Sequence, residues 1–87
     1  MYAPVQSWDG DKNTWEQPSN ALAVPDHYTR ARRPITVIAT IIWPRSGTGQ
    51  VPGIAEAWTP RAVLVYIDDR RLRIRGVWLP AHNVRRA

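Results

Sequence analysis

Cysteine is absent from this 87-residue sequence, so neither a disulfide nor a cysteine-ligated zinc site supports the fold. The two histidines, His27 and His82, do not lie at a spacing typical of metal ligands. Asp68 and Asp69 are neighbours in a predicted turn, where their side chains diverge and make a poor acid–base pair. We therefore expect a protein that is not an enzyme and that has no metal site and no cofactor.

Long apolar segments are also lacking. The longest apolar run, residues 35–43, is about half the length that a membrane-spanning helix needs. The first 33 residues contain four acids and no apolar core of a signal peptide. These absences predict a cytoplasmic protein that does not bind a membrane. A chain of this length forms one domain at most, with a thin core that buries about 60% of the unfolded surface.

Lysine is nearly absent, with one Lys against eleven Arg. Residues 1–29 carry four acids and one lysine, for a net charge of −3, and residues 30–87 carry eleven arginines and three acids, for +8. An acidic arm on a basic body favours an anionic partner, and the planar arginine fork suits phosphate. The codon bias of a GC-rich genome explains the excess of Arg over Lys equally well.

The distribution of β-branched residues predicts short strands and no helix in the C-terminal part. Residues 35–43 and 54–59 are predicted as two strands, separated by a loop over residues 44–53. Residues 62–67 and 71–79 are predicted as a hairpin around a polar turn at 68–70. Four or five short strands of this kind predict an all-β fold, a small antiparallel barrel or a two-sheet sandwich.

Residues 1–33 are predicted to form an irregular arm, because its prolines interrupt any long helix or strand. Ser19 and Asn20 are suited to cap one helical turn, which Pro25 would end. The arm is too aromatic for an ordinary disordered tail. It packs either on its own barrel or on a partner, and the aromatic residues that would make the contact are Tyr2, Trp8 and Trp15.

The segment GVWLPAHNV, residues 76–84, resembles the end of an SH3-like barrel, where a strand, a proline and one 3₁₀ turn precede a short last strand. The resemblance covers residues 34–87 and implies a small SH3-like barrel. Peptide-binding SH3 domains have a tyrosine three residues after the proline, where this chain has Asn83, and an acidic loop where it has Arg45. The resemblance therefore implies the fold without the proline-peptide function.

Side-chain alternation in the predicted strand 71–79 places Leu72 and Ile74 in the core and the intervening arginines outside. A bulge at Gly76 would then point Trp78 outward beside the arginines, whereas a regular strand would leave Trp78 in the core.

Two functions follow from this pattern. The first is a nucleic-acid-binding module, for DNA or RNA, in which outward arginines about 7 Å apart along a strand face phosphates. An edge protected from aggregation by its charges is the purely structural alternative. The candidate residues are Arg61, Arg70, Arg71, Arg73, Arg75, Trp78, Arg85 and Arg86.

The second function is a protein-interaction module, such as a phage- or plasmid-type accessory protein, that docks on an acidic protein surface or on a second copy of itself. Tryptophan and arginine are frequent hot-spot residues at protein interfaces. The residues expected to contact the partner are Tyr2, Trp8, Trp15 and Trp78.

Overall fold

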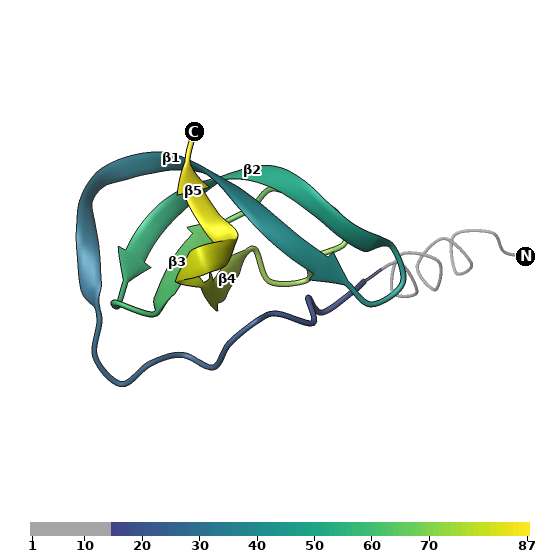
Figure 1. The fold of residues 1–87 in the computed structure, drawn as a ribbon, viewed down its shortest axis with the longest axis horizontal. Coiled ribbons are helices and arrows are strands. Elements are labelled where there is room, and N and C mark those ends of the chain that lie inside the picture. Colours follow the sequence, from purple (N-terminus) through teal and green to yellow (C-terminus); the bar gives the residue numbers. More distant parts are fainter. Residues whose placement is uncertain (1–14) are drawn as a thin grey trace, which may run out of the picture.

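A computed structural model describes residues 15–87, so the predictions for Tyr2 and Trp8 lie outside the described residues. Within residues 15–87, five antiparallel strands form one sheet in the order β4-β3-β2-β1-β5, which confirms the all-β fold class (Figure 1). The elements are β1 (Thr29–Trp43), β2 (Gly47–Trp58), β3 (Ala62–Tyr66), β4 (Gly76–Pro80), the 3₁₀ turn η1 (Ala81–Asn83) and β5 (Val84–Arg86).

The sheet curves around one core, and within residues 15–87 it does not close into a barrel, because β4 and β5 remain its two edges (Figure 1). Among the described residues, the last strand, β5, pairs only with Val37–Ala39 of β1. The strand order, and the single 3₁₀ turn between β4 and β5, are compatible with the SH3-like resemblance. No helix in the described part of the chain has the length and apolar character to cross a membrane.

The core lies against the inner face of the sheet, and β1 shows why. Val37, Ala39, Ile41 and Trp43 alternate with more exposed residues and are all buried, because every second residue of a strand points to the same face. The other strands and the β3–β4 connection complete this core with Ala55, Val65, Ile67, Leu72, Val77 and Leu79.

The loop predicted over residues 44–53 is wrong, because β2 already begins at Gly47. Gly47 pairs with Trp43 across a tight turn and adopts a φ of 83°, a left-handed conformation that favours glycine. Pro52 is accommodated because β2 pairs with β3 only from Ile54 onward, which leaves one side of the strand free at this point. The glycines and proline therefore mark a strand with one free side.

An irregularity in β2 interrupts the regular side-chain alternation of the strand predicted over residues 54–59. The register against β3 shifts between Ala55 and Ala57, so Glu56 lies in a bulge. Ala55 consequently packs in the main core, while Ala57 packs on the opposite face with Ala62 and Trp78. Trp58, which pairs with the core-facing Val63, then lies on the inner side at the open end of the sheet.

The second strand of the C-terminal hairpin is shorter than predicted, because residues 71–75 belong to a loop. Asp69 accepts hydrogen bonds within its own loop, and these turn the chain away from the β3 ladder. Ile74, predicted in the core, is 74% exposed. Pairing from Tyr66–Gly76 to Ala62–Pro80 is regular, so the bulge predicted at Gly76 is wrong as well.

Trp78 is 6% exposed, so it is not open to solvent beside the arginines, as the bulge would have required, and it is not part of the main core, as the regular strand would have required. Its side chain lies on the outer face of the sheet, but the N-terminal segment covers it, and the Tyr28 ring lies 5.2 Å from the Trp78 ring. The Trp78 ring is therefore covered in this structure, whereas the prediction needs it exposed to stack on a base or to contact a partner.

Residues 15–28 run as an extended segment along the sheet and not as the helical turn predicted after Ser19 (Figure 1). The local bond there is a single turn, in which the Ala21 N–H donates to the Pro18 carbonyl at 3.1 Å. This described part of the arm packs on its own sheet. β1 begins at Thr29, so the arginines expected in the arm belong to the first strand.

Candidate nucleic-acid interface

The predicted row of arginines does not exist as a strand face, because Arg71, Arg73 and Arg75 lie in the β3–β4 loop, residues 67–75. We call this segment the aspartate–arginine loop. Its tip extends toward the β1–β2 turn, at the end of the molecule opposite the bend in β1 (Figure 1). Four arginines and two aspartates give the loop a net charge of +2.

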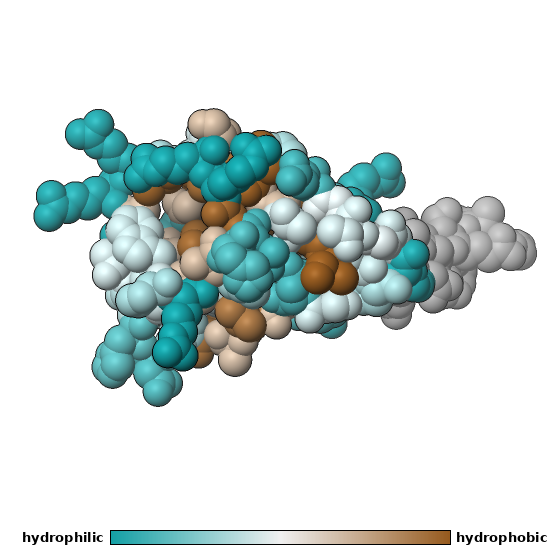
Figure 2. Space-filling model, viewed as in Figure 1, coloured by the Kyte–Doolittle hydropathy of each residue, from teal (hydrophilic) through white to brown (hydrophobic). Residues whose placement is uncertain are grey.

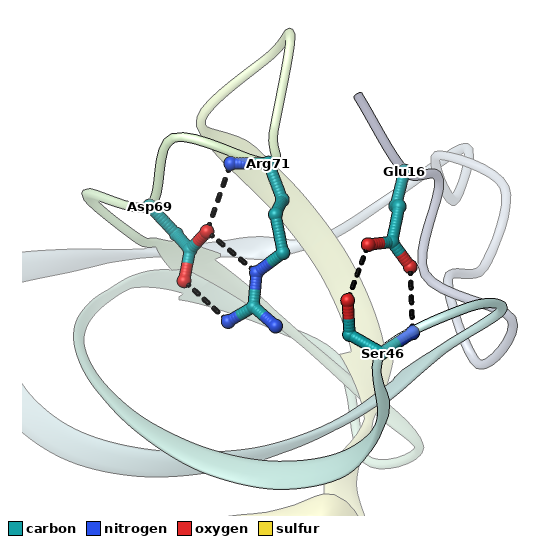
Figure 3. A network of polar contacts seen from close by, with 4 residues as sticks. All are labelled: Glu16, Ser46, Asp69 and Arg71. Atoms are coloured by element: carbon teal, nitrogen blue, oxygen red, sulfur yellow. Dashed lines mark hydrogen bonds and ion pairs between the residues drawn. The ribbon is translucent and has the colours of Figure 1, made fainter. Parts of the chain in front are cut away.

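The Arg71 side chain is fixed within the loop by hydrogen bonds to Asp69 (Figure 3). Its Nε and Nη2 atoms donate to the two carboxylate oxygens of Asp69 at 3.0 and 2.8 Å, and its backbone N–H donates to Asp69 Oδ1 at 2.9 Å. The guanidinium carbon also lies 3.9 Å from the centre of the Trp43 ring. These hydrogen bonds lower the pKa of Asp69 and raise the pKa of Arg71. The same bonds hold the turn together, so Arg71 closes the loop.

The other loop arginines are also partly committed. Arg75 forms an ion pair with Asp68, and the Arg73 guanidinium carbon lies 5.3 Å from the centre of the Trp15 ring. Arg70 is exposed and forms no ion pair with any described residue. Two of the four charges are thus neutralised inside the loop, which weakens its attraction for an external phosphate.

A second cluster of arginines surrounds a groove of about 670 Å³ at the other end of the molecule. We call it the arginine groove. It is lined by Thr29, Arg30, Arg32, Arg33, Pro34, Ile35, Thr36, Trp58, Arg86 and Ala87. Arg85 reaches an adjoining hollow of about 200 Å³, which shares Trp58 and Arg86 with the groove.

The irregularity in β1 creates this cluster. Arg30 pairs with Ala57 and Ile35 pairs with Ala55, so β1 advances five residues while β2 advances two. The extra residues leave the ladder and carry Arg32 and Arg33 away from the sheet. Pro34 fits this bulge because it has no N–H to donate to a ladder.

The short strand β5 brings the fourth arginine to the same place, because Arg86 pairs with Val37 just beyond the bulge. Hydrophilic side chains accordingly project from the end of the molecule at which β1 bends (Figure 2). Trp58, turned to the inner side by the bulge at Glu56, contributes a half-buried indole to the groove wall.

None of the groove arginines forms an ion pair within residues 15–87, since both ion pairs found there lie in the aspartate–arginine loop. Glu56 lines a separate hollow of about 270 Å³ on the other side of the β1 bulge, together with Arg30, Arg32 and Arg33. The groove therefore concentrates unneutralised positive charge on a concave surface, the arrangement that attracts anions most strongly.

The residues predicted from the sequence divide between these places. Arg85 and Arg86 lie at the groove, Arg61 is exposed in the β2–β3 connection, and Trp78 is buried. Arg70, Arg71, Arg73 and Arg75 lie in the distant loop. Sequence reasoning missed Arg30, Arg32, Arg33 and Trp58, although a pair of arginines directly before Pro34 is the local signal of an irregular, charged strand segment.

No protein-family model matches this chain, and neither a curated protein nor a solved structure is significantly similar to it. Within residues 15–87, no group of three His, Cys, Asp or Glu side chains is placed to hold a metal ion. The groups that the arginine groove offers to a ligand include its guanidinium groups and the Trp58 indole.

Proposed function

We propose that this protein is a non-catalytic module that binds a nucleic acid along its phosphate backbone in the arginine groove. The observation that carries the proposal is the convergence of Arg30, Arg32, Arg33 and Arg86 on one concave surface, with no ion-pair partner among residues 15–87. Arg30 also contacts the Tyr28 hydroxyl at 3.5 Å, but a guanidinium without a carboxylate partner can still offer its charge and donors to phosphate oxygens.

The groove also offers a surface for a sugar or a base. Trp58 lies in its wall and Ile35 beside it, so a nucleotide held by its phosphate can place an apolar face on the indole. Stacking of this kind tolerates any base, which suits a module without a base-reading element. The expected ligand is single-stranded DNA or RNA, whose bases are free to stack.

The charge of the whole described chain supports long-range attraction. Residues 15–87 hold eleven arginines against five acids, a net charge of +6. We also assign the sheet to the SH3-like class of small barrels, on its strand order and on the 3₁₀ turn that precedes β5. Asn83 replaces the tyrosine of the peptide-binding SH3 domains in this turn, and the fold by itself names no ligand.

Two charge-matched double variants test the proposal. Arg32→Glu with Arg33→Glu alters the groove, and Arg70→Glu with Arg73→Glu makes the same change of charge in the aspartate–arginine loop. Binding of labelled single-stranded DNA and RNA is measured by fluorescence anisotropy over a series of salt concentrations. We expect the groove variant to lose at least about tenfold in affinity and its salt slope to fall by about 2, since two phosphate contacts disappear.

The loop variant serves as the control and should bind within about threefold of the unaltered protein. The small remaining loss comes from its lower net charge, whose long-range effect is screened by salt. Equal losses in the two variants would show that only net charge matters. A loss confined to the loop variant would place the interface at the aspartate–arginine loop, whose arginines the sequence suggested.

A further inference from the structure

Residues 16–22, which we call the strap, contact the sheet as a bound peptide would. The strap lies between two free strand edges. One is the edge of β1 beyond the residues that pair with β5, and the other is the edge of β4. Its hydrogen bonds reach β1, the β1–β2 turn, the aspartate–arginine loop and β4, all distant in the sequence. The residues that receive it are Thr40, Ile42, Arg45, Ser46, Arg71, Trp78 and Asn83, which we call the strap groove.

At one end the strap groove recognises a carboxylate (Figure 3). Glu16 Oε1 accepts hydrogen bonds from the backbone N–H groups of Arg45 at 2.9 Å and Ser46 at 3.1 Å, and Oε2 accepts one from Ser46 Oγ at 2.5 Å. The bond from the Ser46 hydroxyl is the largest cause of the lowered pKa of Glu16. The Glu16 N–H in turn donates to the Arg71 carbonyl at 2.8 Å.

In the middle, Asn20 binds the free edge of β1 as a neighbouring strand would. Its Nδ2 donates to the Thr40 carbonyl at 2.9 Å and its Oδ1 accepts the Ile42 N–H at 3.1 Å. The Ser19 N–H adds a bond of 2.7 Å to the Ile42 carbonyl, and Pro18 is buried. A carboxylate and a carboxamide four residues apart thus set the register of the strap.

At the other end the strap leaves β4 incompletely paired. Within residues 15–87, the Leu22 N–H to the Trp78 carbonyl, at 2.8 Å, is the one backbone bond between the strap and β4. A strand edge with free N–H and C=O groups is a template for an added strand. Beside Glu16, a hollow of about 370 Å³ lined by Leu72, Arg73 and Ile74 is also open to a longer ligand.

The connection between the strap and β1 is loosely held. Residues 23–27 form no hydrogen bond with the rest of the described chain, and Val24 is 68% exposed. The strap can therefore leave its groove without the loss of any pairing between β1 and β2.

We infer that the strap groove is a peptide-binding site which the strap occupies in cis, and that its ligand in trans is an extended segment of a partner protein with the pattern Glu-x-Pro-x-Asn. The strap already fills the groove of its own chain, and the short connection gives it an effective concentration in the millimolar range, so a ligand in trans must make contacts beyond those of the strap. A longer partner segment pairs further along β4, and this added pairing drives the exchange.

An exchange experiment tests the inference. A protease recognition sequence is inserted after Val24, in the exposed connection, and cleaved in the folded protein, which leaves the strap held without a covalent link. A fluorescent peptide with the sequence of residues 15–24 is then added, together with a control peptide carrying Glu16→Gln and Asn20→Ala. We expect the first peptide to displace the cleaved strap and to bind at least about tenfold more tightly than the control.

Four results would overturn the inference. Unfolding of the cleaved protein on removal of the strap would make the strap an inseparable part of the fold. If the body stayed folded, either no binding of the first peptide or equal binding of both peptides would show that the groove does not recognise the strap pattern. Concentration-dependent dimers of the uncut protein would instead assign the groove to a second copy. None of these results involves nucleic acid, so the arginine groove is tested separately.

Discussion

The aspartate–arginine loop and the arginine groove are both rich in arginine, yet the structure makes opposite use of them. In the loop, Arg71 is fixed by three hydrogen bonds from its own backbone and side chain to Asp69, and it covers Trp43. In the groove, Arg32 and Arg33 lie in a bulge of β1 with no ion-pair partner among residues 15–87. The number of arginines in a segment therefore says little about how much charge it offers a ligand.

The difference arises from local sequence and from register. An aspartate two residues before an arginine in a turn can bond both its backbone N–H and its guanidinium, so charge neutralisation comes with loop closure. A bulge between paired segments pushes adjacent side chains outward and supplies no acid to meet them. We expect substitutions in the loop to change stability, and substitutions in the groove to change binding.

The largest effect on stability is expected for Asp69→Ala. The substitution removes three hydrogen bonds and leaves Arg71 without its partner, at a site where the two side chains are 18% and 32% exposed. The free energy of unfolding should fall by about 1–2 kcal/mol, which is at the lower end for bonds to charged groups because the loop is at the surface. Urea denaturation followed by tryptophan fluorescence measures the change.

The matched variant for this test is Arg32→Ala with Arg33→Ala, whose free energy of unfolding should change by less than about 0.5 kcal/mol. If the groove variant were as destabilised as Asp69→Ala, the division between a structural and a binding cluster would be wrong.

Acid should weaken the end of the molecule that holds the loop and the strap. The pKa of Glu16 lies below its ordinary value of 4.5, chiefly through the Ser46 hydroxyl, and the pKa of Asp69 lies below 3.8, chiefly through Arg71. A carboxyl whose pKa is lowered by folding stabilises the fold fully above its unfolded pKa, and this contribution is lost as pH falls through the folded pKa.

We therefore expect the melting temperature to decline below about pH 4.5. The variant with Glu16→Gln and Asp69→Asn should be less stable at neutral pH and should decline less steeply in acid. A pH series of thermal melts checks both statements, and a decline equally steep in the variant would assign the acid sensitivity to other carboxyl groups.

The smallest effect is expected for Arg75→Ala. The pair that Arg75 forms with Asp68 is exposed, with 41% and 81% of the two side chains accessible, so solvent screens the attraction. The free energy of unfolding should fall by less than about 0.5 kcal/mol. A loss as large as that of Asp69→Ala would show that the whole loop, and not Arg71 alone, stabilises the fold.

Prediction from the sequence succeeded where the pattern is local and repetitive. The apolar run at residues 35–43 was sufficient to predict a strand, which forms the second part of β1. It failed at Gly47, where a turn of three residues lets β2 begin early, and at residues 71–75, where arginines alternate with aliphatic residues outside any strand. Alternation describes how side chains project from a strand, but it does not show that the strand has a neighbour to pair with.

The candidate site was predicted only in part for the same reason. Arg85 and Arg86 were named, while their companions in β1 were assigned to an arm. The groove exists because the β1 bulge lies next to the point where β5 pairs with Val37. That neighbourhood joins segments about fifty positions apart, and no local pattern encodes it.

The sequence by itself determined the all-β class, the strand at residues 35–43 and the large excess of arginine over acid in the C-terminal part, because strand-forming residues and composition are properties of the chain. The tertiary structure decided which arginines are neutralised and which converge on a groove. Those outcomes depend on strand register and on contacts of about 3 Å between residues, and such contacts are set only when the sheet forms.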